Sequence, residues 1–152
     1  MLAALVSALH LLALGIGLGS IFARFRALHA VARGEAQRVK DVLLADNLWG
    51  LAAALWIATG LTRVFGGMEK SLDFYMFNGL FWVKMSLFGA IFLLELGPIA
   101  TFIRWRFDLK KGAAPDTRTA ARLATVSRIQ LVLVVLTVFT AAAMARGLWL
   151  IA

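Results

Sequence analysis

The chain of 152 residues contains no cysteine, only two prolines and only two histidines. Without cysteine there is no disulfide scaffold, no iron–sulfur cluster and no thiol chemistry. Two histidines without an acidic cluster also argue against a dedicated transition-metal cage. Neither the glycine pattern of dinucleotide-binding folds nor the phosphate-binding loop of nucleotide triphosphatases occurs. The sequence therefore lacks the short motifs by which many enzymes are recognised.

Charged residues are also scarce, whereas apolar residues are abundant. Charged residues make up 16% of the chain, against about a quarter in soluble proteins. Hydrophobic residues make up 62%, and the mean hydropathy is +0.86. A soluble domain of this size could not bury so much apolar surface. This composition excludes a soluble enzyme and a disordered chain, and it predicts one integral membrane domain over residues 1–152.

Four apolar segments are long enough to cross a bilayer as helices, which takes about 20 residues each. They cover residues 2–23, 43–65, 74–103 and 127–150. They are too long for barrel strands, and backbone groups in a bilayer must be satisfied internally. The first segment is not expected to be a cleaved signal peptide, because no basic region precedes it and its arginines follow it. The sequence predicts an all-α fold, an antiparallel four-helix bundle.

Basic residues indicate the orientation of this bundle, because they concentrate in two connections. The connection after the first span and the one after the third carry most of them: Arg24, Arg26, Arg33, Arg38, Lys40, Arg104, Arg106, Lys110, Lys111, Arg118 and Arg122. The positive-inside rule places both connections in the cytoplasm and both termini outside. The net charge of +8 then reflects topology and attraction to anionic lipids of the cytoplasmic face, not nucleic acid.

The two halves of the chain resemble each other at the ends of the first and third spans. Residues 22–26 read FARFR and lead to Gly34, and residues 102–106 read FIRWR and lead to Gly112. Each helix is expected to continue past the membrane and to end at its glycine in the left-handed conformation. A duplicated helical hairpin or a chance similarity explains the pattern. Asp116 is expected to cap the last helix.

Polar residues within the spans are candidates for function, because burying a charge in a membrane is costly. Glu95 lies deep in the third span beside Pro98, which is expected to kink the helix. Its expected partner is Gln130 or Arg128 on the last helix, and the alternative is a proton path or a ligand site.

Asp46 and Asn47 stand at the start of the second span. They are expected to cap that helix or to pair with Arg24 or Arg128, and direct participation in chemistry is the alternative.

A count along the helices predicts relative depths, if Arg24 and Arg104 mark one cytoplasmic level. At 1.5 Å per residue, His10 lies roughly 21 Å from that level, Glu95 about 13 Å and Lys84 about 30 Å. The same count places Met144 and Trp56 near the level of His10. It also places the basic residues Arg63, Lys84 and Arg146 near the outer rim of the bundle. Lys84 is there expected either to extend to the outer lipid headgroups or to take part in a functional site.

Three stretches resemble an uncharacterised family of small bacterial four-helix membrane proteins. They are ADNLWG at residues 45–50, FGGMEK at residues 65–70 and FWVKM at residues 81–85. The resemblance covers nearly the whole chain. It implies a multi-pass protein of the bacterial inner membrane, but it implies no activity.

More distantly, His10, Arg26 and Lys84 resemble the pattern of HemJ-type protoporphyrinogen oxidases and related copper-resistance membrane domains. In the HemJ group, the histidine of the first span is associated with b-type haem. Where that pattern has aromatic residues in the second half of the first span, this chain has Gly17 and Ala23. This departure argues against the oxidase activity more than against cofactor binding.

If His10 binds haem b, it is the axial metal ligand, and Met144 or His10 of a second copy is the candidate sixth ligand. The outer cations Arg63, Lys84 and Arg146 are then expected to pair with the propionates. The alternative is that a neutral His10 donates a hydrogen bond to a neighbouring helix.

The function is therefore either a haem-binding redox role in the outer half of the bundle or that of a cofactor-free membrane subunit or small-molecule binder. Enzymatic activity and assembly into a homo-oligomer or larger membrane complex stay open. A proton-coupled transporter using Glu95 is a weaker third alternative.

Overall fold

The computed structural model describes residues 1–67 and 70–149, and its regular structure there is helical. The four long helices are α1 (Leu2–Ala32), α2 (Val39–Phe65), α4 (Gly79–Lys110) and α5 (Ala120–Ala145). A short 3₁₀ helix, η1 (Ala36–Arg38), and a short helix, α3 (Leu72–Met76), lie in the connections. Each long helix is long and apolar enough to cross a membrane. The predicted all-α membrane helical bundle is confirmed.

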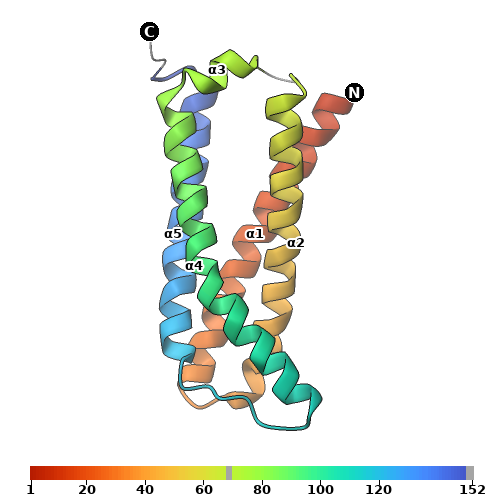
Figure 1. Ribbon diagram of the computed structural model, residues 1–152, viewed down its shortest axis with the longest axis vertical. Helices are drawn as coiled ribbons and strands as arrows, with labels where there is room; N and C mark the ends of the chain where they lie inside the picture. The colour runs from red at the N-terminus through yellow and green to blue at the C-terminus, as the bar shows by residue number, and fades with distance from the viewer. Residues whose placement is uncertain (68–69, 150–152) are drawn as a thin grey trace.

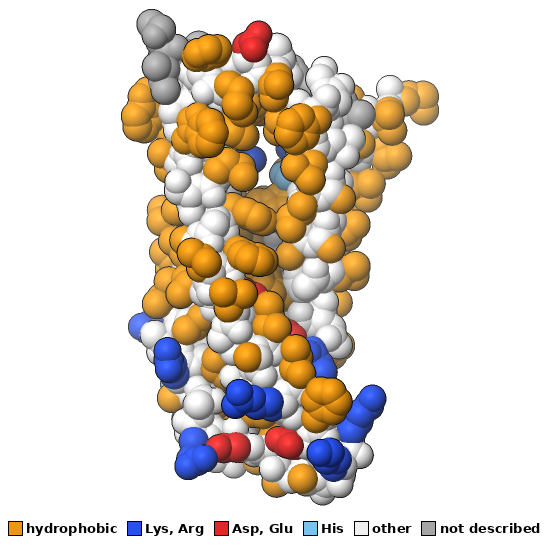
Figure 2. Space-filling model, in the orientation of Figure 1, with side chains coloured by type: hydrophobic (Ala, Val, Ile, Leu, Met, Phe, Trp, Pro, Cys, Tyr) orange, Lys and Arg blue, Asp and Glu red, His pale blue; other side chains and the backbone are white. Residues whose placement is uncertain are grey.

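The long helices run antiparallel, so the start of α1, the end of α5 and α3 lie at one end of the bundle and the two basic connections lie at the other (Figure 1). We call these the terminal end and the basic end. Basic side chains gather at the basic end, and apolar side chains cover the surface above them (Figure 2). Helix α1 packs along α2 and α5, and α4 packs along α5. By contrast, α2 and α4 make few close backbone approaches, and they stand apart toward the terminal end (Figure 1).

Two glycines end the long helices at the basic end, as expected. Gly34 has a φ of +101° and Gly112 a φ of +71°, the left-handed region that side chains with a Cβ avoid. Helices α1 and α4 therefore continue well beyond the apolar spans predicted for them, to Ala32 and Lys110.

The helix boundaries differ from those of the predicted apolar segments. The third long helix begins at Gly79, after the start of the apolar segment at residue 74, because the Asn78 side chain accepts a hydrogen bond from the Leu80 amide at 2.9 Å and caps it. The last helix begins at Ala120, before the apolar segment that starts at residue 127, and it ends at Ala145, shortly before Gly147 with its φ of +74°. Residue 150, its predicted end, lies outside the described residues.

Asp116 does not cap the last helix, contrary to prediction. Its side chain instead accepts hydrogen bonds from the backbone amide and the guanidinium of Arg118, both within the exposed connection. These hydrogen bonds lower the pKa of Asp116 from 3.8 to about 2. Thr119 occupies the cap position of α5.

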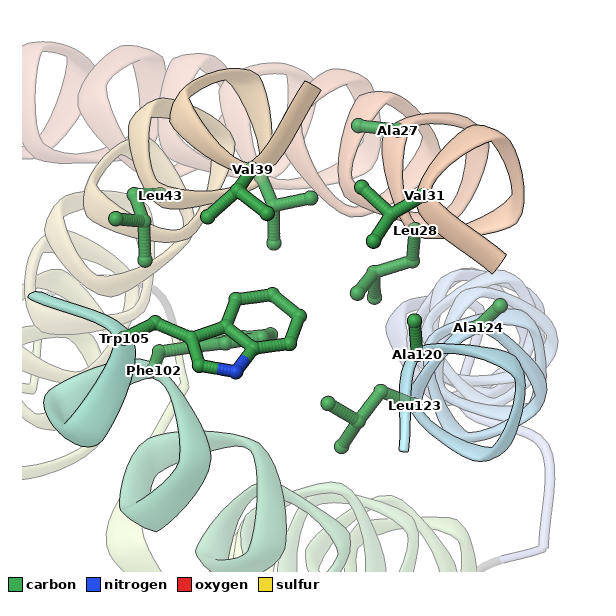
Figure 3. Packing of buried hydrophobic residues seen from close by; sticks show 11 residues of the cluster. Ala27, Leu28, Val31, Val39, Leu43, Phe102, Trp105, Ala120, Leu123 and Ala124 are labelled. Atoms are coloured by element: carbon green, nitrogen blue, oxygen red, sulfur yellow. The ribbon is translucent and has the colours of Figure 1, made fainter. Parts of the chain in front are cut away.

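An apolar core at the basic end joins all four long helices. Trp105 and Phe102 of α4 are fully buried at its centre, and aliphatic side chains of α1, α2 and α5 surround them (Figure 3). The indole Nε1 of Trp105 donates a hydrogen bond to the carbonyl oxygen of Asp116 at 2.9 Å. The connection between α4 and α5 is thereby fixed against this core.

Candidate functional site

A buried arginine joins the four helices just above this apolar core. Arg24 of α1 is fully buried, and its side chain reaches Glu95 on α4. Its Nη1 and Nη2 donate to the two carboxylate oxygens of Glu95 at 2.6 and 2.8 Å, the bidentate geometry that is strongest for this pair. Nη1 also donates to Asp46 of α2 at 3.0 Å, and Nε donates to the Ser127 hydroxyl of α5 at 3.2 Å. One guanidinium thus binds side chains from the other three long helices.

Gln130 of α5 completes the coordination of Glu95. Its amide nitrogen donates to Glu95 Oε2 at 2.6 Å and to the Ile91 carbonyl oxygen at 3.2 Å. Its amide oxygen accepts from Arg24 Nη2 at 2.7 Å. The predicted contact between Glu95 and Gln130 is confirmed, whereas Arg24 as the main partner of Glu95 was not predicted.

The second oxygen of Asp46 extends the network toward the basic end. It accepts from Arg106 of α4 at 2.9 Å, and the same nitrogen of Arg106 donates to Asn47 at 2.7 Å. The expected pairing of Asp46 with Arg24 is confirmed. Arg24, Arg106, Asp46 and Glu95 contribute two positive and two negative charges, so the network has no net charge. Buried charges are tolerated when they are paired in this way.

Two aromatic rings face the buried guanidinium. The centre of the Arg24 guanidinium lies 5.7 Å from the ring of Trp49 and 5.6 Å from that of Phe102. Both distances are within the range of a cation–π interaction, which is stronger where water is excluded. We refer to Arg24, Asp46, Glu95, Arg106 and Gln130 as the arginine network.

The prediction that Arg24 and Arg104 mark one cytoplasmic level was wrong. Arg24 is buried and meets Glu95, whereas Arg104 lies nine residues beyond Glu95 on α4 and is exposed. Arg24 belongs to a stripe of buried positions on α1 that includes Gly17, Ile21 and Leu28. Spacings of three, four and seven residues place these positions on one helical face. The matching residues of the two sequence stretches therefore do not occupy equivalent positions.

A cavity of about 430 Å³ lies between the helices near the terminal end. Its polar and titratable lining comes from several helices: His10, Trp56, Arg63, Lys70, Tyr75, Lys84 and Thr137. Figure 2 shows a hollow between the two columns of helices, inside which basic and histidine side-chain atoms are visible. None of the described residues that line this cavity is acidic. We call it the outer cavity.

A hydrogen bond fixes the ring of His10 in this cavity. His10 Nδ1 lies 2.8 Å from the Thr59 hydroxyl oxygen of α2. That hydroxyl donates its hydrogen to the Leu55 carbonyl oxygen at 2.6 Å, so the histidine nitrogen is the donor in its contact with Thr59. This is the hydrogen bond to a neighbouring helix that the sequence offered as the alternative to haem ligation. The two are compatible, because metal-bound histidines commonly donate their other ring nitrogen in this way.

The structure gathers some of the residues predicted for a haem site and separates others. His10, Arg63, Lys84 and Met144 line the outer cavity together. Arg146 is exposed beyond the end of α5 and does not line the cavity. Arg26 is exposed too, and it lies 16 residues along α1 from His10, about 24 Å at the helical rise.

An apolar crevice between α2 and α4 continues from the outer cavity. A hollow of about 230 Å³ adjoins the cavity, and a further one of about 370 Å³ reaches down to Asp46 and Glu95. Trp56 lines all three spaces. Its Nε1 is buried and finds no hydrogen-bond partner among the described residues. Such an unsatisfied donor is uncommon in native proteins. We call this space the α2–α4 crevice.

Neither Arg24 nor Trp56 was predicted as a site residue. For Arg24 a signal existed, since it lies in helical register with the small and apolar residues of the same span. For Trp56, the sequence predicted only its depth, near the level of His10. Among the described residues, no three histidine, aspartate or glutamate side chains are grouped as metal ligands.

Four apolar helices and internally paired charges define a polytopic integral membrane protein. The chain belongs to the family described as "Predicted membrane protein (DUF2214)", whose model matches residues 2–148. No curated protein and no solved structure matches the chain. The comparisons thus confirm membership of an uncharacterised membrane family, and they do not show the resemblance to HemJ-type oxidases.

Proposed function

We propose that this membrane protein binds an anionic amphiphile, a molecule with an acidic head and an apolar body, in the outer cavity. One observation carries the proposal: Arg63 and Lys84 line a cavity that continues into an apolar crevice between α2 and α4. Ionisable residues within membrane spans are candidates for function by default, although long basic side chains near a helix end can also reach the membrane interface. An acidic head group would pair with them where charge-assisted hydrogen bonds are strong.

Trp56 supplies a further reason for a ligand. Its buried Nε1 lacks an acceptor among the described residues, and it lies where the outer cavity meets the crevice. A carboxylate or phosphate oxygen of a ligand would satisfy this donor. Removing the cost of a buried unsatisfied group contributes to affinity.

We further propose that the basic end faces the cytoplasm of a bacterium, with both termini outside the inner membrane. The support is the concentration of arginine and lysine at the end that holds the two connections (Figure 2). The same end would attract anionic lipids of the cytoplasmic leaflet. In this orientation the outer cavity lies in the outer half of the bilayer, and its ligand would come from that leaflet.

Binding of cis-parinaric acid, a fluorescent fatty acid, by the detergent-purified protein tests the proposal. The double variant Arg63→Gln/Lys84→Gln is expected to bind at least tenfold more weakly, because a hydrogen bond to a charged group contributes about 1.5–3 kcal/mol. Arg146→Gln is the matched control, since Arg146 is an exposed cation beyond the same end of the bundle. Equal affinity of the double variant and the wild type would refute the proposal.

Haem b, itself an anionic amphiphile, is a second candidate ligand. The specific support is that His10 and Met144, two residue types that ligate haem iron, line the outer cavity with Arg63 and Lys84. His10 Nδ1 is hydrogen-bonded to the Thr59 hydroxyl, and metal-bound histidines commonly donate a hydrogen bond from the ring nitrogen that does not hold the metal. When bound, haem would supply one-electron redox chemistry, with His10 as its axial ligand and the two cations near its propionates.

The Soret absorbance of protein produced with ample haem tests this candidate. A band in the wild type that is lost in His10→Ala is the expected result. No band in the wild type, or an unchanged band in His10→Ala, would exclude His10 as a haem ligand.

A further inference from the structure

We infer that the ligand is a single-chain anionic lipid whose hydrocarbon chain lies in the α2–α4 crevice, with its head at Arg63 and Lys84. This inference rests on the proposed function and specifies the ligand's class and orientation. The first support is that the bundle is not closed between α2 and α4, the one pair of sequence-adjacent long helices that lacks close packing. The space between them is bounded by side chains of both helices and is partly open to the surface of the bundle.

The lining of the crevice suits a slender apolar chain. On α2, successive turns contribute both small residues, among them Gly50 and Ala53, and larger ones such as Trp56, and α4 contributes Phe88 and Ile91. A Cβ placed on Gly50 would meet no atom within 4 Å, so open space lies directly beside this backbone. A flat, rigid ligand needs width, whereas a single hydrocarbon chain needs only length.

The length of the crevice matches one lipid chain. Gly60 lines the hollow next to the outer cavity, and Gly50 lines the lower hollow. Ten residues of helix between them span about 15 Å. The hydrocarbon core of a bilayer is about 30 Å thick, so its half, the depth of one leaflet, is also about 15 Å.

The charges at the two ends of the crevice set the orientation of the ligand. Arg63 and Lys84 lie at the upper end, and the carboxylates of Asp46 and Glu95 lie at the lower end. An acidic head group is attracted to these two cations. At the lower end the carboxylates are already paired with Arg24, so the described residues offer no unpaired positive charge there for the head group. The apolar chain must therefore point toward the arginine network.

Blocking the crevice tests the inference separately from the proposed function. Gly50→Leu and Ala53→Leu each place a side chain in the space assigned to the hydrocarbon chain. Stearate affinity, measured by displacement of cis-parinaric acid, is expected to fall at least tenfold in both variants. Octanoate, whose chain is too short to reach Gly50, is expected to compete equally well in the variants and the wild type.

Gly19→Leu is the matched control, because a Cβ on Gly19 also meets no atom within 4 Å and Gly19 is exposed outside the crevice lining. Unchanged stearate binding in Gly50→Leu and Ala53→Leu, with binding still lost in Arg63→Gln/Lys84→Gln, would overturn the inference and leave the proposed function standing. Unchanged binding in the cation variant would overturn both. An altered oligomeric state of Gly50→Leu, without altered stearate binding, would assign the crevice to a second copy instead.

Brominated stearic acids test the orientation directly, because bromine quenches nearby tryptophan fluorescence. The contribution of Trp56 is the difference in quenching between the wild type and Trp56→Phe. Bromines near the carboxylate are expected to quench Trp56 more strongly than bromines near the methyl end. The opposite order would overturn the assigned orientation.

Discussion

Replacing Arg24 by methionine tests whether the arginine network holds the four helices together. The variant keeps an unbranched side chain but removes every hydrogen bond that the guanidinium donates to Glu95, Asp46, Ser127 and Gln130. Glu95 then keeps only the amide of Gln130, and its charge is no longer balanced. Breaking a buried ion pair by removing one partner typically costs about 3–5 kcal/mol, because the other charge stays buried. We therefore expect Arg24→Met to lower the free energy of unfolding by about 3–5 kcal/mol.

The double variant Arg24→Met/Glu95→Met separates the cost of the orphaned charge from the loss of the side chain. Because it removes both charges of the bidentate pair, we expect it to be at least about 2 kcal/mol more stable than Arg24→Met alone. Unfolding can be followed by the loss of helical circular dichroism as sodium dodecyl sulfate is added to mixed micelles.

Arg104→Met is the matched control. Arg104 occupies the same place in FIRWR as Arg24 does in FARFR, but its side chain is exposed. It is expected to change stability by less than about 0.5 kcal/mol. If Arg24→Met cost no more than Arg104→Met, or if the double variant were no more stable than Arg24→Met, the reasoning about the buried charge would be refuted.

Three further predictions concern the basic end and the start of α4. Trp105→Ala should lower the free energy of unfolding by about 3–5 kcal/mol, and Trp105→Phe by clearly less, as measured in the same detergent titration. Asn78→Ala should cost about 0.5–2 kcal/mol through loss of the cap of α4, and Asn78→Asp should recover only part of that stability, because a carboxylate keeps the cap but cannot donate to the Leu148 carbonyl oxygen as the Asn78 amide does. Arg118→Gln should raise the pKa of Asp116 from about 2 toward 3.8, as followed by carboxyl NMR titration. Because the folded pKa is depressed, the pair contributes most above pH 3.8, and its contribution is lost as the pH falls toward 2.

The sequence predicted those features of the fold that depend on local composition. Long apolar runs predict four helices because the bilayer allows few alternatives, and glycine after a basic turn predicts the helix ends at Gly34 and Gly112. Hydropathy did not predict the start of α4. Phe74 and the residues after Asn78 are equally apolar, and only the capping hydrogen bond of Asn78 separates α3 from α4.

The arginine network was predicted only in part, because hydropathy counts an arginine as a boundary residue. Glu95 and Gln130 were expected to meet, but Arg24 was assigned to the membrane surface. Its long side chain and its place on the buried face of α1 bring it to Glu95. The α2–α4 crevice was not predicted at all, since the order of spans does not specify which pairs of helices pack closely.

The two halves of the bundle differ in what they contribute. At the basic end, the apolar core around Trp105 and the arginine network connect all four long helices. Toward the terminal end, α2 and α4 separate, and the cavities that contain His10 and Lys84 occupy the space between them. A buried indole donor without an acceptor lies at their junction, which is a cost that a ligand would remove. Because the apolar core and the arginine network connect α2 and α4 at the basic end, these two helices can stand apart toward the terminal end. Variants in the arginine network should therefore mainly lower the free energy of unfolding, and variants in the crevice should mainly weaken ligand binding.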